Sequence, residues 1–306
     1  MSFFSKVRDY QKTYGFFKAF KVILNRKKQS LKAKEDMNKN ISLLDEKYSH
    51  LLKDFTYAPE KKEIPKVFYF FWYDGISSLP KICSMCLLKL KRLYPDYKIV
   101  FIDKKYISDM EEINPLYLKL LDEKKITIQF FSDLLRWTLL SSRGGVWIDS
   151  TVYLAKRLEI NSNSADGFFT LNTKNHSSFL SYKGKSCCYS SFFIATSENH
   201  PLAQAMLKLF DSYLLDNDGN DIYFLIDIFL MFCLIYRVGD SCMDRFKDSF
   251  SLDYNCYFLS ENLSKKADDE SLSYLDRGPM KLNWRIDIDK YMETTIIRKI
   301  YKEAMK

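Results

Sequence analysis

Three runs of β-branched and aromatic residues, each of strand length, alternate with helical patterns in the first half of the chain. They are KVFYFFWY (66–73), YKIVFID (97–103) and GVWID (145–149). Helical patterns over 79–93 and 104–142 separate them. Strand–helix–strand alternation with connections of this length predicts parallel pairing in an α/β sheet with both faces covered. The central sheet is therefore expected to be mostly parallel.

The second half of the chain continues the alternation. Apolar runs at 167–171 and 191–196 predict two more strands, and helical patterns cover 201–215 and 221–237. The last of these is strongly apolar, but it is shorter than the ~20 residues that a membrane span needs, and it contains Asp227. We expect a buried helix of a globular domain there. An acid in so apolar a helix either faces a ligand crevice or is satisfied by helix packing.

The cysteines favour a reducing compartment. The chain has 7 of them, an odd number without framework spacing, and no signal-peptide pattern. We therefore expect free thiols and a cytoplasmic location. Cys83 and Cys86 form a single C-x-x-C pair, which fits two positions of a helix better than a zinc site, since zinc takes four N or S ligands.

The net charge of +8 is concentrated at the N-terminus. Residues 1–34 hold ten Lys/Arg and one acid, whereas the remainder holds 37 basic and 38 acidic residues. A nucleic-acid-binding domain is expected to carry its basic surface on the folded unit, so this distribution argues against nucleic acid as a partner. We divide the chain into a basic helical arm, 1–60, and a main domain, 61–306.

The arm contains an amphipathic pattern. Aromatic and aliphatic residues recur every three or four positions: Phe3, Val7, Tyr10, Tyr14, Phe17, Phe20 and Leu24. A helix with such a face and a basic remainder suits an anionic membrane surface, which predicts peripheral attachment to the inner face of the plasma membrane through 1–34. The alternative is that the helix packs against the protein's own body or a partner helix.

Charged residues interrupt the otherwise apolar segment FSDLLRWTLLSSRGGVWIDS (131–150), which follows Phe130. Asp133 and Arg136 are three residues apart, so they share a helix face and can pair. A buried ion pair is seldom a net gain in stability, which indicates either a functional role or a pair that fixes the helix in place.

Asp149 follows the third predicted strand. The carboxyl ends of strands line the ligand crevice in α/β sheets, so a carboxylate there is a candidate for binding a metal such as Mg²⁺ together with a substrate phosphate. A strand-end Asp also serves as a cap or turn residue. Gly144 and Gly145 allow a sharp turn and a close approach of backbone to a ligand.

The order IPKVFYFFW, FSDLLRWTLLSSRGGVWIDS, YFLIDIF and KLNW resembles the DXD-motif sugar transferases of glycosyltransferase family 32, and among them the bacterial capsular polysaccharide branch. The resemblance spans about Ile64 to Arg285, and its specific block is Ser132 to Thr151. It implies a GT-A type α/β fold and a retaining, nucleotide-sugar-dependent transferase that uses Mn²⁺ or Mg²⁺.

The resemblance also implies roles for individual residues. Trp72 matches the aromatic residue that stacks on the donor base, while Asp133 and Arg136 match the pair that holds the donor sugar and phosphate. Asp149 matches the first Asp of the metal motif, and Thr151 stands where the second Asp is expected. The remaining positions implied in donor binding or in stabilising the diphosphate are Gly144, Gly145, Asp227, Lys281, Trp284 and Arg285. Met280 stands where relatives carry a His.

We therefore expect a hexosyltransferase that moves a sugar, from a UDP-sugar in the first instance, to a growing capsular or lipid-linked glycan. Asp149, Asp133 and Arg136 are its predicted catalytic residues, and Asp149 and Thr151 its predicted metal ligands. The alternative from another class is a non-catalytic, membrane-associated binding protein with a degenerate glycosyltransferase fold.

Overall fold

The computed structural model describes residues 35–60, 62–173, 180–186, 188–217, 219, 222 and 224–305. The chain divides into two compact units, Met1–Ser49 and His50–Lys306. Within the first unit a helix occupies 35–48. The amphipathic pattern predicted over 1–34 lies outside the described residues.

A five-stranded sheet forms the centre of the second unit. Its spatial order is β2 (Lys98–Ile102), β1 (Val67–Phe71), β3 (Gly145–Ile148), β8 (Tyr189–Thr196) and β5 (Phe168–Asn172). β1 pairs in parallel with β2 and with β3, as the sequence predicts. β8 runs antiparallel to both of its neighbours, β3 and β5, so the sheet is mixed and the prediction of a mostly parallel sheet holds only for its first three strands.

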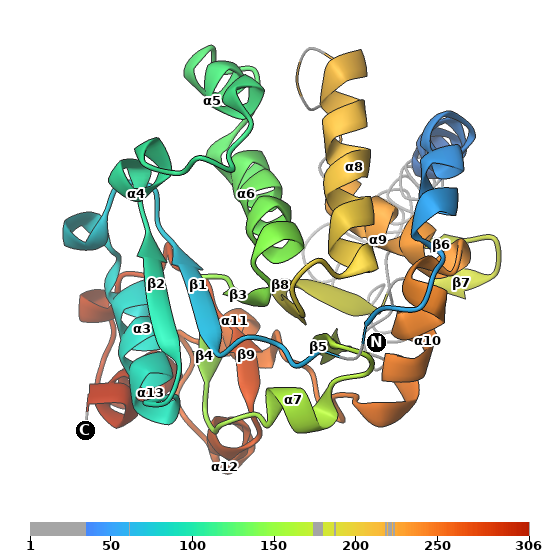
Figure 1. Ribbon diagram of the computed structural model, residues 1–306. Helices are drawn as coiled ribbons and strands as arrows, with labels where there is room; N and C mark the ends of the chain where they lie inside the picture. Colours follow the sequence, from blue (N-terminus) through green and yellow to red (C-terminus); the bar gives the residue numbers. More distant parts are fainter. Residues whose placement is uncertain are drawn as a thin grey trace, which may run out of the picture. The chain divides into compact units, whose positions relative to one another are not determined.

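Two crossovers join the parallel strands (Figure 1). α3 (Lys81–Leu93) links β1 to β2, and α4 (Lys104–Ser108), α5 (Pro115–Asp122) and α6 (Ile128–Ser142) link β2 to β3. Since β2 and β3 lie on opposite sides of β1, right-handed crossovers place α3 and α6 on different faces of the sheet. The chain also reverses its direction across the sheet between β1 and β3, and ligand crevices of α/β sheets form at such a point.

The other elements of the second unit are mostly helical. They are η1 (Ser49–Phe55, which begins at the unit boundary), η2 (Ile76–Ser78), α7 (Ile160–Asn163), α8 (Pro201–Asp216), α9 (Leu225–Ile235), α10 (Val238–Ser249), α11 (Phe258–Asn262), α12 (Asp269–Ser273), η3 (Tyr274–Asp276), η4 (Ile288–Lys290) and α13 (Ile296–Met305). α6 packs on α8, the helices α8, α9 and α10 pack on one another, and α13 packs beside α3 (Figure 1).

α9 is the buried helix predicted from its apolar sequence. Its residues are buried from Leu225 to Leu234 with the exception of Asp227, which is partly exposed. In the described part of the chain, no helix has both the length and the apolar character that crossing a membrane requires.

Short strands supplement the sheet. β4 (Val152–Leu154) pairs antiparallel with β9 (Pro279–Lys281), and β6 (Ser181–Tyr182) pairs with β7 (Lys185–Ser186). The sequence did not predict them, because two or three residues are too few to show an alternating pattern. The β4–β9 pair brings a segment near the C-terminus beside the end of β3.

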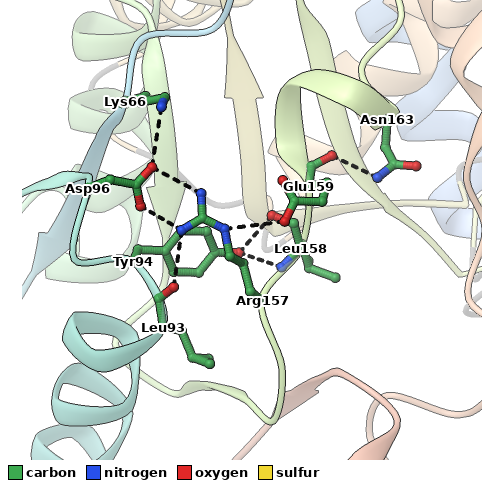
Figure 2. A network of polar contacts seen from close by, with 8 residues as sticks. All are labelled: Lys66, Leu93, Tyr94, Asp96, Arg157, Leu158, Glu159 and Asn163. Atoms are coloured by element: carbon green, nitrogen blue, oxygen red, sulfur yellow. Dashed lines mark hydrogen bonds and ion pairs between the residues drawn. The ribbon is translucent and has the colours of Figure 1, made fainter.

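A polar network holds the amino ends of β1 and β2 (Figure 2). Arg157 forms two hydrogen bonds with the Asp96 carboxylate, at 2.5 and 3.0 Å, and stacks on the ring of Tyr94. Lys66, just before β1, reaches the same carboxylate at 3.3 Å. The Tyr94 hydroxyl in turn accepts from the backbone N–H of Leu158. This network ties the segment after β4 to the sheet edge opposite to the carboxyl ends of the parallel strands.

Candidate functional site

α6 and β3 form a sharp helix–strand hairpin that brings their charged residues together. Gly144 and Gly145 make the turn with φ values of 62° and 105°. From this turn, Arg136 lies about 12 Å back along the helix and Asp149 about 16 Å forward along the strand, at about 1.5 and 3.3 Å per residue. Residues thirteen positions apart therefore meet on facing elements.

Arg136 is the centre of the resulting cluster. Its Nη1 donates to Asp133 Oδ1 at 2.6 Å, and its Nη2 donates to Asp149 Oδ1 at 3.1 Å. The Arg136 side chain is 4% exposed, whereas those of Asp133 and Asp149 are 21% and 27% exposed. The two carboxylates thus reach solvent while the cation between them is enclosed. The cluster is consequently accessible to a ligand.

Two further side chains complete the hydrogen bonds of Asp149. Trp147 lies two residues earlier on the same face of β3, and its Nε1 donates to Asp149 Oδ1 at 2.9 Å. Its ring also stacks under the Arg136 guanidinium, 4.9 Å from the centroid. Lys281 Nζ donates to Asp149 Oδ2 at 2.5 Å and lies over the ring of Phe192. β9 places Lys281 there, because it pairs with Val152 of β4, just beyond Asp149.

The two carboxyls of the cluster have opposite electrostatic environments. Burial raises the pKa of Asp133 to about 6, although Arg136 opposes this shift. Burial also acts to raise the pKa of Asp149, but the charges of Lys281 and Arg136 outweigh it and the pKa is lowered overall. Asp149 is therefore the carboxyl that stays ionised over the whole physiological range.

Asp227 belongs to the same environment. It lies in the first turn of α9, where burial and, to a smaller extent, the charge of Asp133 raise its pKa to about 7. Burial raises the pKa of the Tyr257 hydroxyl as well, and the charges of Asp227 and Asp149 add to that shift. Its charge coupling places Asp227 near Asp133 and Arg136, and its contact with a ligand stays a prediction.

Two tryptophans form an aromatic pair beside the carboxyl ends of the strands. Trp72 follows β1, and Trp284 follows β9; their ring centroids are 5.6 Å apart in an edge-on arrangement. Trp284 is 40% exposed. Arg285 lies against the Trp284 ring at 5.1 Å.

A surface depression of about 540 Å³ lies where β1 and β2 end. Residues that follow β1 and β2 line it: Tyr73, Asp74, Gly75, Asp103, Lys104, Lys105 and Ser108. Its volume falls within the range of small-molecule sites, about 300–1,000 Å³.

The structure does not bring Gly144 and Gly145 to this cluster. They lie at the amino end of β3, whereas Asp149 follows its carboxyl end. A Cβ on Gly144 would meet the backbone N of Glu198 at 2.5 Å, and one on Gly145 would meet the Tyr69 ring at 3.0 Å. These glycines make room for the protein's own backbone and side chains, which differs from their predicted part in donor binding.

Similarity to known proteins shows the family of this chain. A family model described as capsular polysaccharide synthesis protein matches residues 19–300. The chain belongs to this capsular polysaccharide synthesis family. The capsular part of the predicted resemblance is thereby confirmed, while the relation to glycosyltransferase family 32 and the DXD motif stay predictions. The solved structure named "PaToxG Glycosyltransferase" is similar to this chain with 16% identity and a TM-score of 0.42, over 71% of this chain and 87% of that one. No curated protein matches the sequence.

In this capsular polysaccharide synthesis protein, the residues predicted to hold Mn²⁺ or Mg²⁺ are Asp149 and Thr151. Asp149 accepts from three N–H donors, two of them cationic, so a divalent ion there would have to displace Lys281. The Thr151 residue is 6% exposed. Among the described residues, no group of three or more His, Cys, Asp or Glu is placed to hold a metal. The side chains around Asp149 therefore fit an ammonium group better than a divalent metal.

Three aromatic residues near the cluster were not predicted from the sequence of this capsular polysaccharide synthesis protein: Trp147, Phe192 and Tyr257. Trp147 could have been found, because strand residues two apart share a face and Asp149 was already a candidate. Phe192 and Tyr257 are distant in sequence from the charged cluster, and no local pattern marks them.

Proposed function

We propose that this protein is a glycosyltransferase. Its donor is a nucleotide sugar, with a UDP-sugar the first candidate, and its acceptor is a hydroxyl group of a growing capsular or exopolysaccharide chain or of a lipid-linked oligosaccharide. Membership in the capsular polysaccharide synthesis family supports the acceptor class. The resemblance in the segment 132–151 supports the donor class.

The observation that carries the proposal is the juxtaposition of Asp133, Arg136 and Asp149 at the carboxyl edge of the sheet. The enclosed guanidinium of Arg136 bonds to Asp133 at 2.6 Å and to Asp149 at 3.1 Å. Both carboxylates are partly open to solvent. Removing these groups from water is costly, and apolar residues could fill the same space with equal or greater stability. A ligand that offers hydroxyl groups to the carboxylates and a negative charge to the cations of the cluster accounts for their presence.

The proposed chemistry follows from the charges. When the bond from the sugar to the diphosphate breaks, negative charge develops on the departing oxygen, and fixed cations stabilise it without reorganisation. Arg136 and Lys281 are the cations of the cluster. Asp133 accepts hydrogen bonds from sugar hydroxyls, and Asp149 holds the two cations in position. Trp72 offers its ring to the base.

A hydrolysis screen tests the proposal. Each nucleotide sugar of a panel is incubated alone with the protein, and slow release of the nucleoside diphosphate is measured. Glycosyltransferases transfer the sugar to water when no acceptor is present. We expect turnover with one donor class and its loss in Asp149→Ala. The melting temperature of the variant shows whether it is folded, since Arg136 keeps its bond to Asp133 but Arg136, Trp147 and Lys281 lose their acceptor at Asp149.

The screen also separates the alternative function. Quenching of tryptophan fluorescence by UDP without turnover of any donor would support a non-catalytic binding protein. Full activity in Asp149→Ala would remove Asp149 from the mechanism.

We further propose that the basic segment 1–34 attaches the protein to an anionic membrane surface. Its charge of ten basic residues against one acid supports this. Co-sedimentation with vesicles should require anionic lipid and disappear when 1–34 is deleted. Equal binding to neutral vesicles would contradict the electrostatic part.

A further inference from the structure

The Lys281 ammonium occupies the position at Asp149 where a divalent ion would bind. Its Nζ lies 2.5 Å from Asp149 Oδ2, and the other oxygen accepts from Arg136 and Trp147. Lys281 belongs to β9, whose pairing with β4 fixes its backbone relative to Asp149. The backbone N–H of Leu282 bonds to the carbonyl of Thr151 at 2.9 Å, which reinforces the same alignment. The position of the ammonium is thus set by the fold.

Lys281 is also able to bind a second anion. An ammonium has three N–H donors, and among the described residues Asp149 is the acceptor that Lys281 reaches. The side chain is 23% exposed, so its remaining donors can reach solvent or a ligand. The Phe192 ring, 5.1 Å from Nζ, supports the cation from one side.

A divalent ion would meet an unfavourable environment at the same place. It would stand next to the Arg136 guanidinium and would have to expel Lys281 from its ion pair. Thr151, in the place of a second carboxylate, supplies no compensating negative charge. The Lys281 ammonium therefore already supplies a positive charge at Asp149, and the surrounding residues offer little attraction for a divalent cation.

We propose that Lys281 replaces the divalent cation of the donor site, so that the protein binds the diphosphate of its donor and transfers the sugar without a metal. This inference rests on the proposed function and adds the identity of the group that stabilises the leaving diphosphate. In the transfer, the bond between the anomeric carbon and the diphosphate oxygen breaks with its electron pair on that oxygen. The oxygen of the acceptor hydroxyl bonds to the anomeric carbon and releases its proton to water.

Equilibrium binding tests this directly in the full-length protein. UDP, GDP, ADP and CDP are titrated by calorimetry, once in excess EDTA and once with Mn²⁺. For the nucleotide that binds, we expect the Kd in EDTA to lie within about threefold of the Kd with Mn²⁺. Lys281→Met should weaken binding in EDTA about tenfold or more, as expected for a lost charge-assisted hydrogen bond.

Two matched variants control for folding and for charge. Lys281→Arg keeps a cation and should retain most of the affinity, and Lys290→Met removes an exposed lysine of η4 and should leave binding unchanged. The melting temperature of each variant shows that it is folded. If Lys281→Met does not fold, the comparison of EDTA with Mn²⁺ in the unaltered protein decides alone.

The possible outcomes are distinct. Binding or donor hydrolysis that requires Mn²⁺ overturns the inference and leaves the proposed glycosyltransferase in place. Failure of every nucleotide to bind, with or without Mn²⁺, overturns both. Equal binding in EDTA together with a loss in Lys281→Met supports both.

Discussion

Arg136 donates one hydrogen bond to Asp149, 3.1 Å away and thirteen positions later in the chain, while its other terminal nitrogen bonds to Asp133. One enclosed guanidinium thereby holds two carboxylates from two elements. Its Nε is buried and has no partner in the described part of the chain. The Arg136 guanidinium is consequently the structural centre of the cluster, and its Nε–H is a hydrogen-bond donor without an acceptor among the residues that the structure describes.

Replacing Arg136 should therefore affect stability as well as activity. In Arg136→Met two carboxyls face each other without a cation between them, and breaking a buried pair in this way costs about 3 kcal/mol or more. We expect the free energy of unfolding, measured by urea denaturation, to fall by that amount and donor turnover to be lost. Arg136→Met combined with Asp133→Leu should recover part of the stability. A midpoint unchanged in the single variant would contradict the enclosed ion pair.

The aromatic pair predicts an effect on donor affinity rather than on chemistry. Stacking of a base on an aromatic ring is worth about 1–3 kcal/mol, so Trp72→Ala should raise the KM for the donor about tenfold and change kcat little. Trp72→Phe keeps a ring face but loses the indole hydrogen bond to Ser78, 3.1 Å long in the structure. It should restore most of the affinity. A loss confined to kcat would place Trp72 away from the base.

Asp227 predicts opposite effects on stability and activity. Its folded pKa of about 7 lies above the ordinary value of 3.8, so its contribution to stability is present at low pH and is lost as the pH rises from about 4 to 7. Asp227→Asn should hence melt at the same or a lower temperature than the unaltered protein at pH 4 and several degrees higher at pH 8.

The activity of the same variant gives an independent check. If the ionised Asp227 accepts a hydrogen bond from a sugar hydroxyl, donor turnover should rise with pH through about 7, and Asp227→Asn should lose both the activity and that rise. A variant that gains stability at pH 8 and keeps full activity would show that Asp227 is only a poorly accommodated helix residue.

The parts of the site that are local in sequence could be predicted, and the parts assembled from afar could not. Asp133, Arg136 and Asp149 all belong to one helix–turn–strand segment, where helix and strand periods and a two-glycine turn set their distances. The contact between Lys281 and Asp149 spans 132 positions. Lys281 was a candidate only by resemblance, because the three-residue strand that carries it has no readable pattern.

Strand direction shows the same limit for the fold. The apolar run at 191–196 predicted a strand, and β8 occupies Tyr189–Thr196. Its antiparallel insertion between β3 and β5 was not predicted, since a fully buried strand reads the same in either direction. The connection between β5 and β8 contains the β6–β7 hairpin and no covering helix within its described residues, which permits the reversal.

Gly144 predicts a steric effect on folding. With φ at +62° and backbone atoms of Glu198 and Ser197 at 2.5 and 2.7 Å from an added Cβ, Gly144→Ala requires the backbone to move. Gly184 has a similar φ of +73° and open space around it, so Gly184→Ala should cost only about 1 kcal/mol of backbone strain. We expect Gly144→Ala to lower the free energy of unfolding, measured by urea denaturation, several times as much as Gly184→Ala does. Equal losses would show that the α6–β3 turn can relax.

His200 predicts how stability depends on pH. It is the N-cap of α8: its Nδ1 accepts from the backbone N–H of Leu202 at 3.1 Å, and the residue is 1% exposed. Burial lowers its pKa from 6.5 to about 4. Below pH 6.5 the unfolded chain binds a proton that the folded chain refuses, so the free energy of unfolding falls between pH 6.5 and 4, by roughly 3 kcal/mol at about 1.36 kcal/mol per pKa unit.

His200→Asn isolates this contribution. Asn keeps an acceptor for the Leu202 N–H and is a preferred N-cap, but it does not titrate. The variant should be less stable at pH 8, because the buried ring is lost, and its stability should decline less between pH 6.5 and 4 than that of the unaltered protein. Other carboxyls titrate in both proteins, so the difference between the two pH curves, measured by urea unfolding, belongs to the imidazole. Parallel curves would mean that folded His200 takes up its proton near pH 6.5, which an imidazole enclosed against the carbonyl of Asp166 cannot do without breaking the cap.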